Sequence, residues 1–243
     1  MTRLHYAAGS DTGKRRQVNQ DSMYASPRLL AVADGIGGQP HGEVASAAAI
    51  AVMAELDNDL RGLDSREIDA EAALASITRR IGDRLAALAE TNQEYRGMGT
   101  TLTALLWDGT GFAAVHVGDS RGYLLRDGAL HQITRDHTLV QALVDDGRLA
   151  ADQAAGHPRR SMLMKALQST GSSEPDRWRF DAAPGDRYLL CSDGLTCVAA
   201  PDVIEEVLTT IDDPAAAVTR LIDLANEGGS PDNVTCVVAD VVP

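Results

Sequence analysis

Four aspartates lie where an apolar run of residues meets a turn. Asp34 follows Leu-Leu-Ala-Val-Ala, Asp119 follows Ala-Val-His-Val-Gly, Asp193 follows Tyr-Leu-Leu-Cys-Ser, and Asp232 precedes Val-Thr-Cys-Val-Val. A strand fixes the backbone on one side of each carboxylate, while a Gly, Ser or Asn on the other side permits a tight turn. If the strands are neighbours, the carboxylates converge, and their repulsion and lost hydration are tolerable only around divalent cations. The sequence therefore predicts a metal site.

Oxygen atoms are the ligands that these turns offer. Asp34 provides a carboxylate that can bridge two ions, and Gly35 lets a ligand approach the backbone, so its carbonyl is a further ligand. Oxygen-only ligation favours Mg²⁺ or Mn²⁺. The six histidines are scattered and form no H-E-x-x-H pattern, which disfavours a zinc hydrolase. Two hard cations lower the pKa of a water between them and orient it for attack on phosphorus, so a phosphomonoester is the natural target.

A cationic group that holds the phosphate oxygens is also needed. The run from Lys14 to Asp21 supplies Arg16, whose guanidinium can form a bidentate fork, five residues before Asp21. A short stretch of mixed charge is more often a solvated loop, so this run carries little weight alone.

The elements that must position these residues follow from the apolar periodicity. Ser22–Ala33 predicts two strands around Ser26-Pro27-Arg28, and two amphipathic helices follow, one from Glu43 and one in a segment that Asp64 opens. Four β-rich runs predict an antiparallel meander: Thr101–Trp107, Phe112–Val117, Gly122–Leu125 and Ala129–Ile133. An irregular lobe at about 136–170 comes next, followed by a strand, two helices and a last strand: Asp186–Ser192, Pro201–Thr210, Pro214–Glu227 and Val234–Val242.

Helices that are grouped between strands, instead of alternating with them, argue against a doubly wound parallel sheet. We expect an α+β fold, a four-layer α-β-β-α sandwich with two packed antiparallel sheets and a small flap. Such sheets would bring the strand ends, and the aspartates on them, to one edge. The 243 residues, 44% of them hydrophobic, suffice for a single domain that spans 1–243.

Charge and cysteine usage narrow the function further. The 22 basic and 35 acidic residues give a net charge of −13, which disfavours nucleic acid and anionic membranes as partners. Three cysteines without C-x-x-C spacing suggest neither a disulfide framework nor a zinc site, so we expect a cytoplasmic protein. We also expect a monomer. No apolar run is long enough to span a bilayer, so we expect no membrane insertion by this chain. It could still be the cytosolic domain of a membrane-anchored protein.

The ordered motifs of the chain resemble one family, the metal-dependent serine/threonine protein phosphatases of the protein phosphatase 2C type, in particular the bacterial branch. A single Asp-Gly dipeptide is worthless as evidence, but eight stretches in the family's order cover nearly the whole chain. They are Arg16–Asp21, Ala33–Gly38, Gly97–Leu102, Val117–Arg121, Asp136–Thr138, His157–Ser161, Cys191–Leu195 and Pro231–Thr235.

The resemblance implies a role for each site residue. Asp34 bridges two ions, Gly35 gives its carbonyl to one of them, and Asp193 and Asp232 hold the other. Asp21 helps to hold the second ion, through water. Arg16 resembles the phosphate-gripping arginine. Asp119 with Asp193 resembles the ligands of a weaker third ion, although Asp119 could also be an ordinary turn aspartate. Residues 136–170 correspond to the mobile flap.

The turn after Asp34 departs from the family pattern. Many relatives carry a histidine there, thought to donate a proton to the leaving oxygen. Here Ile36 cannot donate, Gln39 occupies the position usual for the bacterial histidine, and His41 is displaced behind a proline. His41 is a candidate general acid, and a solvated loop histidine is the alternative.

These observations predict a phosphatase that hydrolyses phosphoserine and phosphothreonine by attack of a water or hydroxide bridging two Mn²⁺ or Mg²⁺ ions. Its expected partners are phosphorylated proteins, among them serine/threonine kinases and their substrates. A cysteine nucleophile is disfavoured because the C-x5-R signature is absent. The alternatives are a non-catalytic phosphoprotein-binding regulator of the same fold, which would have lost a metal aspartate, and a partner-switching phosphatase, whose relatives generally lack the Arg16 motif.

Overall fold

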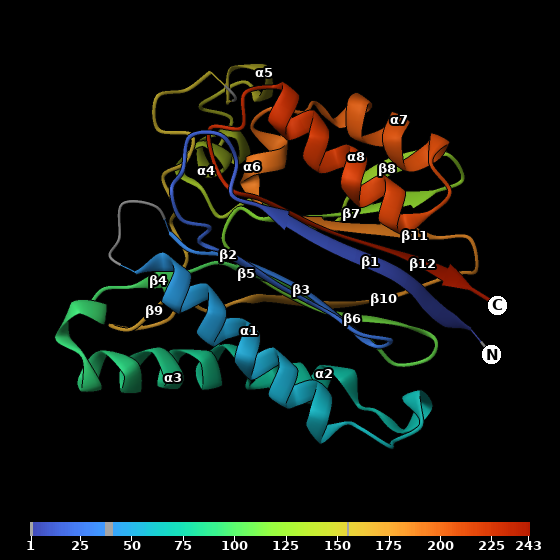
Figure 1. Cartoon of the computed structure of the whole chain (residues 1–243), viewed down its shortest axis with the longest axis horizontal. Coiled ribbons are helices and arrows are strands. Elements are labelled where there is room, and N and C mark those ends of the chain that lie inside the picture. The colour runs from blue at the N-terminus through green and yellow to red at the C-terminus, as the bar shows by residue number, and fades with distance from the viewer. Residues whose placement is uncertain (1, 37–40, 155) are drawn as a thin grey trace.

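Two five-stranded antiparallel sheets pack face to face in the computed structural model, which describes residues 2–36, 41–154 and 156–243 (Figure 1). Sheet A has the order β1-β12-β11-β7-β8, and sheet B has the order β10-β6-β5-β3-β2. The strands of sheet A are β1 (Arg3–Asp11), β7 (Arg121–Arg126), β8 (Ala129–Gln132), β11 (Arg187–Cys191) and β12 (Val234–Val242). Those of sheet B are β2 (Asp21–Ala25), β3 (Leu29–Asp34), β5 (Leu102–Trp107), β6 (Gly111–Val117) and β10 (Asp176–Asp181). A small pair joins β4 (Gly99–Thr100) to β9 (Leu167–Gln168).

Helices cover the outer face of each sheet. On sheet B lie α1 (Gly42–Asp59), α2 (Ala70–Ala75) and α3 (Ile77–Thr91), and on sheet A lie α7 (Pro201–Thr210) and α8 (Pro214–Glu227). Short helices α4 (Leu139–Asp145), α5 (Ala151–Ala154) and α6 (Asp193–Thr196) lie near one end of the sandwich (Figure 1). None of the helices within the described ranges is both long and apolar enough to cross a membrane.

Three apolar layers hold the sandwich together. One fills the space between sheet B and α1–α3, one lies between the two sheets, and one lies between sheet A and α6–α8. Strand β3 shows how a sequence encodes such layering: Leu29 and Ala31 face the helices, and Leu30 and Val32 face sheet A, so the whole run is apolar. The predicted four-layer α-β-β-α sandwich is confirmed.

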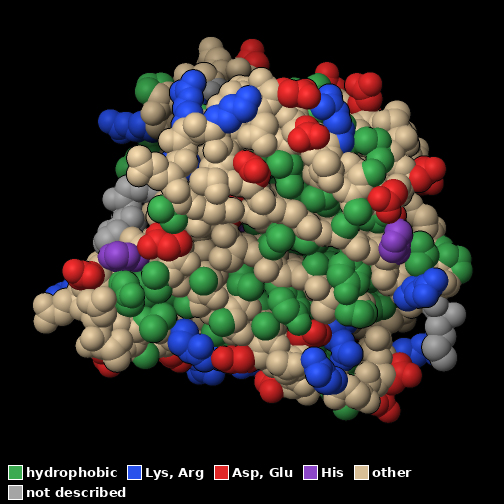
Figure 2. Space-filling view, viewed as in Figure 1, with side chains coloured by type: hydrophobic (Ala, Val, Ile, Leu, Met, Phe, Trp, Pro, Cys, Tyr) green, Lys and Arg blue, Asp and Glu red, His purple; other side chains and the backbone are tan. Residues whose placement is uncertain are grey.

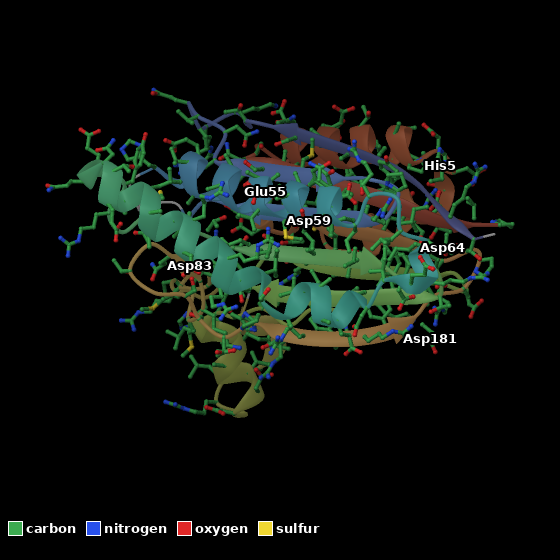
Figure 3. All side chains as sticks on the ribbon, turned by 90° about the horizontal axis from the view of Figure 1, so that it is seen from below. His5, Glu55, Asp59, Asp64, Asp83 and Asp181 are labelled. Carbon is green, nitrogen blue, oxygen red and sulfur yellow. The ribbon has the colours of Figure 1, made fainter. Side chains whose placement is uncertain are left out.

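Ion pairs join α1 to α3, the two long helices on sheet B. Figure 3, seen from below, shows α1 and α3 side by side in front of sheet B, with Glu55 and Asp59 of α1 labelled. Arg80 and Arg84 of α3 reach Glu55 at 3.6 and 2.8 Å. Exposed pairs of this kind contribute at most about 1 kcal/mol each, so the buried faces provide most of the stability.

The predicted meander is wrong. β5 pairs with β6 and β7 pairs with β8, but β6 lies in sheet B and β7 in sheet A. The turn between them, Gly118 to Ser120, carries the chain from one sheet to the other. Gly118 has φ 117°, and a side chain on it would collide with Thr101 at 2.5 Å, so the crossing depends on glycine.

Three further details differ from the sequence prediction. The capping box of Asp64 and Glu67 forms, but it caps a 3₁₀ turn, Ser65–Glu67, and the expected long helix is divided at Ser76 into α2 and α3. Strand β1 was missed because its residues are half-exposed and alternate irregularly. Strand β10 was missed because charged residues interrupt it, as is common in edge strands.

Candidate active site

Antiparallel pairing brings the predicted acidic residues to one edge of the sandwich. Asp21 begins β2, Asp34 ends β3, and the register places the two residues opposite each other. In sheet A, Asp193 follows the end of β11, and Asp232 precedes the start of β12. Asp119 lies in the turn that leaves β6. These five aspartates form the acidic edge.

Asp34 lies at the electrostatic centre of the acidic edge. Burial raises its pKa well above the usual carboxyl value, and the charges of the other four aspartates raise it further. Asp21 and Asp193 are the aspartates whose charges raise it most. A bound proton or cation would relieve this repulsion, because neighbouring bare carboxylates repel one another strongly.

Burial and neighbouring negative charges also raise the pKa of other aspartates of the acidic edge. Burial, and then Asp232 and Asp21, raise the pKa of Asp193 to about 6. Burial and the charge of Asp193 raise the pKa of Asp119 well above its usual value. Perturbed carboxyls gathered at one solvent-facing edge are typical of a functional site, since nothing in the packing requires them.

Asp21 carries the clearest sign that the acidic edge binds a cation. Its Oδ2 accepts a 2.7 Å hydrogen bond from Ser192, whereas its Oδ1 is buried and has no hydrogen-bond partner among the described residues. Ser192 is itself fixed by the amide of Thr235, at 3.0 Å. An acceptor held rigidly in this way, beside other carboxylates, fits a hard divalent cation or the water that such an ion carries.

The backbone at Asp34 is held firmly. Its N–H donates to Thr101 Oγ1 at 3.0 Å, and its carbonyl accepts from Thr100 Oγ1 at 2.9 Å. Gly35 follows in close contact with another segment: a Cβ there would lie 2.3 Å from the Gly42 carbonyl oxygen. Only glycine fits here because of this backbone contact, and the ligand role of the Gly35 carbonyl stays a prediction. Sequence reasoning gave no role to the two threonines, although both lie in the quoted Gly97–Leu102 stretch.

Arg16 reaches the acidic edge from the loop between β1 and β2. Its Nη2 lies 2.6 Å from Asp232 Oδ2, and its side chain remains 38% exposed. Asn233 holds this loop, because it accepts from the Gln20 N–H and donates to the carbonyls of Thr12 and Val18. From the sequence, Asn233 was placed in the Pro231–Thr235 motif but given no role. Its position directly after Asp232 was the feature that could have indicated one.

His41 lies apart from these contacts. It begins α1 in a left-handed conformation, its Nδ1 lies 3.2 Å from Glu43, and its ring packs edge-on against Tyr95. The general-acid role of His41 stays a prediction. Gln39, like Gly37 and Gly38 of the expected glycine turn, lies outside the described residues.

Among the described residues, no three acidic, His or Cys side chains form a ready-made metal-binding group. Two members of the acidic edge are engaged by other side chains, Asp232 by Arg16 and Asp21 by Ser192. The donor set nevertheless fits Mn²⁺ or Mg²⁺, since it consists of carboxylate oxygens, one of them without a partner.

The stability of the metal-free protein provides a test of this electrostatic assignment. The pKa of Asp193 rises from its ordinary value of 3.8 to about 6, so the folded protein binds more protons than the unfolded chain, and this stabilisation is lost as pH rises through about 6. We expect Asp193→Asn to gain melting temperature relative to wild type between pH 5 and 7.5, by several degrees. The pKa of His116 is lowered to about 4, so its contribution to stability changes with pH in the opposite direction, equally in wild type and variant. The quantity to measure by calorimetry is therefore the difference in melting temperature between the two proteins. A difference that shrinks with rising pH would contradict the assignment.

A two-sheet sandwich whose edge gathers five carboxylates and an arginine is typical of metal-dependent hydrolases of phosphate esters. Comparison with known proteins agrees: residues 8–232 match the family described as Protein phosphatase 2C. The chain belongs to the protein phosphatase 2C family.

Individual relatives agree with this assignment. Serine/threonine protein phosphatase PstP of Mycobacterium tuberculosis is 52% identical over 98% of this chain. A serine/threonine phosphatase, stp, of Listeria monocytogenes is 32% identical, with 98% of this chain and 96% of the relative covered. The crystal structure of the PstP catalytic domain in complex with two manganese ions is 48% identical with a TM-score of 0.90, covering 100% of both chains. The present chain spans about half of the M. tuberculosis relative, 45% of its length.

Proposed function

We propose that this chain is a metal-dependent protein phosphatase that hydrolyses phosphoserine and phosphothreonine in proteins. The single observation that carries the proposal is the acidic edge, where five aspartates with Asp34 at their centre lie beside an exposed arginine. Family membership supports the same reaction class. Residues 1–243 are proposed to act as one catalytic domain whose flap is 136–170.

Each residue of the acidic edge has a proposed part. Asp34 would hold two ions, assisted by the Gly35 carbonyl, while Asp193, Asp232 and Asp21 would complete the ligation, and Asp119 would serve a weaker third ion. When bound, Mn²⁺ or Mg²⁺ ions acidify water and polarise the phosphoryl oxygens. The protein's own contribution is to fix the Asp34 backbone, through Thr100 and Thr101, and the Asp21 carboxylate, through Ser192.

Arg16 is proposed to bind the substrate phosphate. Its guanidinium lies at the border of the acidic edge and is paired with Asp232. With Asp232 engaged as a metal ligand, Arg16 would be free of this pair, and its fork would match two oxygens of a phosphate. The arginine would thus be available for substrate only after the metal ligands are engaged.

Protein substrates suit the exposed position of the site. The Arg16 loop is open to solvent, and Figure 2 shows several Lys and Arg side chains at the upper left of the face in view. The proposed partners are serine/threonine kinases and their phosphorylated substrates, met in the cytoplasm by a monomeric chain.

The test of the proposal is hydrolysis of a phosphothreonine peptide and an aryl phosphate by the purified chain with Mn²⁺. Release of inorganic phosphate is the expected result. Binding of the phosphopeptide without any hydrolysis would instead favour the non-catalytic regulator, and absence of both would reject the assignment.

Replacing Arg16 by alanine should weaken phosphopeptide turnover and leave metal binding intact. We expect kcat/KM to fall by about tenfold or more, since a charge-assisted fork is lost, and Arg16→Lys should recover part of it as a point charge. Steady-state kinetics and Mn²⁺ titration calorimetry measure the two effects separately. Arg15→Ala, which alters the neighbouring exposed charge, is the matched control. Unchanged kinetics in Arg16→Ala would refute the role.

A further inference from the structure

His137 joins the two ends of the flap to the body of the protein. The flap closes at its base through the Met164 N–H, which donates to the His137 carbonyl at 2.8 Å. Asp176, the first residue of β10, faces both ends: His137 Nε2 lies 3.0 Å from one carboxylate oxygen, and Lys165 Nζ lies 2.8 Å from the other. Both ends of the flap are therefore attached to a single carboxylate on the edge of sheet B.

The same histidine also holds the turn that carries Asp119. The Gly118 N–H donates to His137 Nδ1 at 3.1 Å, and the His137 N–H donates to the Gly118 carbonyl at 2.8 Å. Because Nδ1 accepts a hydrogen bond, the ring proton lies on Nε2. Nε2 is 3.0 Å from an Asp176 carboxylate oxygen, in an electrostatic contact whose geometry is not that of a hydrogen bond. The ring is buried and packs on the ring of His116 with centroids 4.7 Å apart.

Hydrogen bonds continue from this turn to Asp34. Ser120 Oγ lies 2.9 Å from Thr101 Oγ1, the atom that also accepts the Asp34 N–H at 3.0 Å. At the other end of the turn, Arg121 forks onto Asp136, the residue before His137. The turn is thus held by the flap base on one side and by the strand that supports Asp34 on the other.

We propose that His137 is a positioning residue that couples the flap to the Asp119 turn, so that the state of the flap sets how well Asp119 is placed to ligate a cation. This inference rests on the proposed function, because it takes Asp119 as a ligand of the weakest ion. It follows from the geometry that a flap displacement which moves His137 withdraws the acceptor of the Gly118 N–H. Groups that support metal ligands in this way typically change metal affinity by about 10- to 100-fold when removed.

The experiment compares His137→Gln with His137→Asn by Mn²⁺ titration calorimetry without substrate. Glutamine keeps a polar side chain but removes the acceptor near Nδ1, whereas asparagine places its oxygen close to that position. We expect His137→Gln to raise the Kd of the weakest Mn²⁺-binding event by about tenfold or more, and His137→Asn to stay within about threefold of wild type. Exchange of the Gly118 amide should be faster in His137→Gln only.

Lys165→Met is the matched control, because it breaks the other attachment to Asp176 and spares the Gly118 contact. It should leave the weakest Kd within about twofold of wild type.

If His137→Gln does not fold, as judged by near-ultraviolet circular dichroism, Asp176→Asn replaces it and should shift the same Kd in the same direction. A folded variant with the wild-type isotherm, or an equal effect in Lys165→Met or His137→Asn, would overturn the coupling. A wild type that neither binds Mn²⁺ nor releases phosphate would refute the proposed function itself.

Discussion

Replacing Asp34 by asparagine is expected to reduce phosphopeptide hydrolysis by at least about a thousandfold. Asp34 is half-buried at the end of β3, and the charges of all four other aspartates of the acidic edge act on its carboxyl. Loss of metal-derived stabilisation of the transition state costs several kcal/mol, and each 1.36 kcal/mol is about a factor of ten in rate. Steady-state kinetics at saturating Mn²⁺ measure the effect.

The same substitution should not harm the fold. Asparagine has nearly the same shape, and it removes a buried group whose charge is unfavourable in the absence of metal, so the metal-free variant should melt at the same or a higher temperature than wild type. Asp64→Asn, at an exposed turn remote from the acidic edge, is the control and should keep full activity. Substantial hydrolysis by Asp34→Asn with wild-type metal binding would remove Asp34 from the centre of the mechanism.

Removal of divalent cations should abolish activity as completely as the loss of Asp34. With a chelator in excess, the carboxylates of the acidic edge retain no ion, and the described site contains no other group that would activate water. We expect phosphate release to fall to background and to return when Mn²⁺ is added in excess of the chelator. Bound Mn²⁺ should also raise the melting temperature, because it binds the folded state alone.

The cysteines serve as a control for this experiment. Burial raises the pKa of Cys191 to about 12 and that of Cys197 to about 11, and Cys236 is shifted in the same direction, so none of the three is a ready thiolate. Cys197→Ser, the exposed position, should leave Mn²⁺-dependent activity unchanged. Activity that survives the chelator would contradict the metal mechanism, and its loss in Cys197→Ser would point to a covalent one.

Local chemistry in the sequence was enough to predict much of the molecule. The last three long elements, Pro201–Thr210, Pro214–Glu227 and Val234–Val242, occur with the predicted bounds, because proline opens each helix and β-branched residues fill the strand. Four aspartates of the acidic edge, Asp34, Asp119, Asp193 and Asp232, were also found from their positions next to apolar runs, whereas Asp21 was found through the family resemblance. Turn residues next to apolar runs are a local signal, so one chain suffices to detect them.

Other features required contacts between distant segments. The crossing from sheet B to sheet A at Gly118 has the local pattern of an ordinary hairpin turn, and only the pairing partners of β6 and β7 distinguish the two. The irregular run of β1 becomes a strand because it pairs along its whole length with β12, at the opposite end of the chain. Pairing energy between such segments leaves no mark on the spacing of either one.

The sequence by itself determined which chemistry is available: hard oxygen ligands, one arginine able to form a fork, and helices grouped around two sets of strands. Tertiary structure alone decided that Asp21 lies opposite Asp34, that Ser192 and Thr101 hold these two residues, and that His137 links the flap to the turn of Asp119. The reason is physical. Residue type and spacing encode backbone preference and solubility, which are local, whereas register, burial and the pKa of a carboxyl depend on neighbours that only the folded chain brings together.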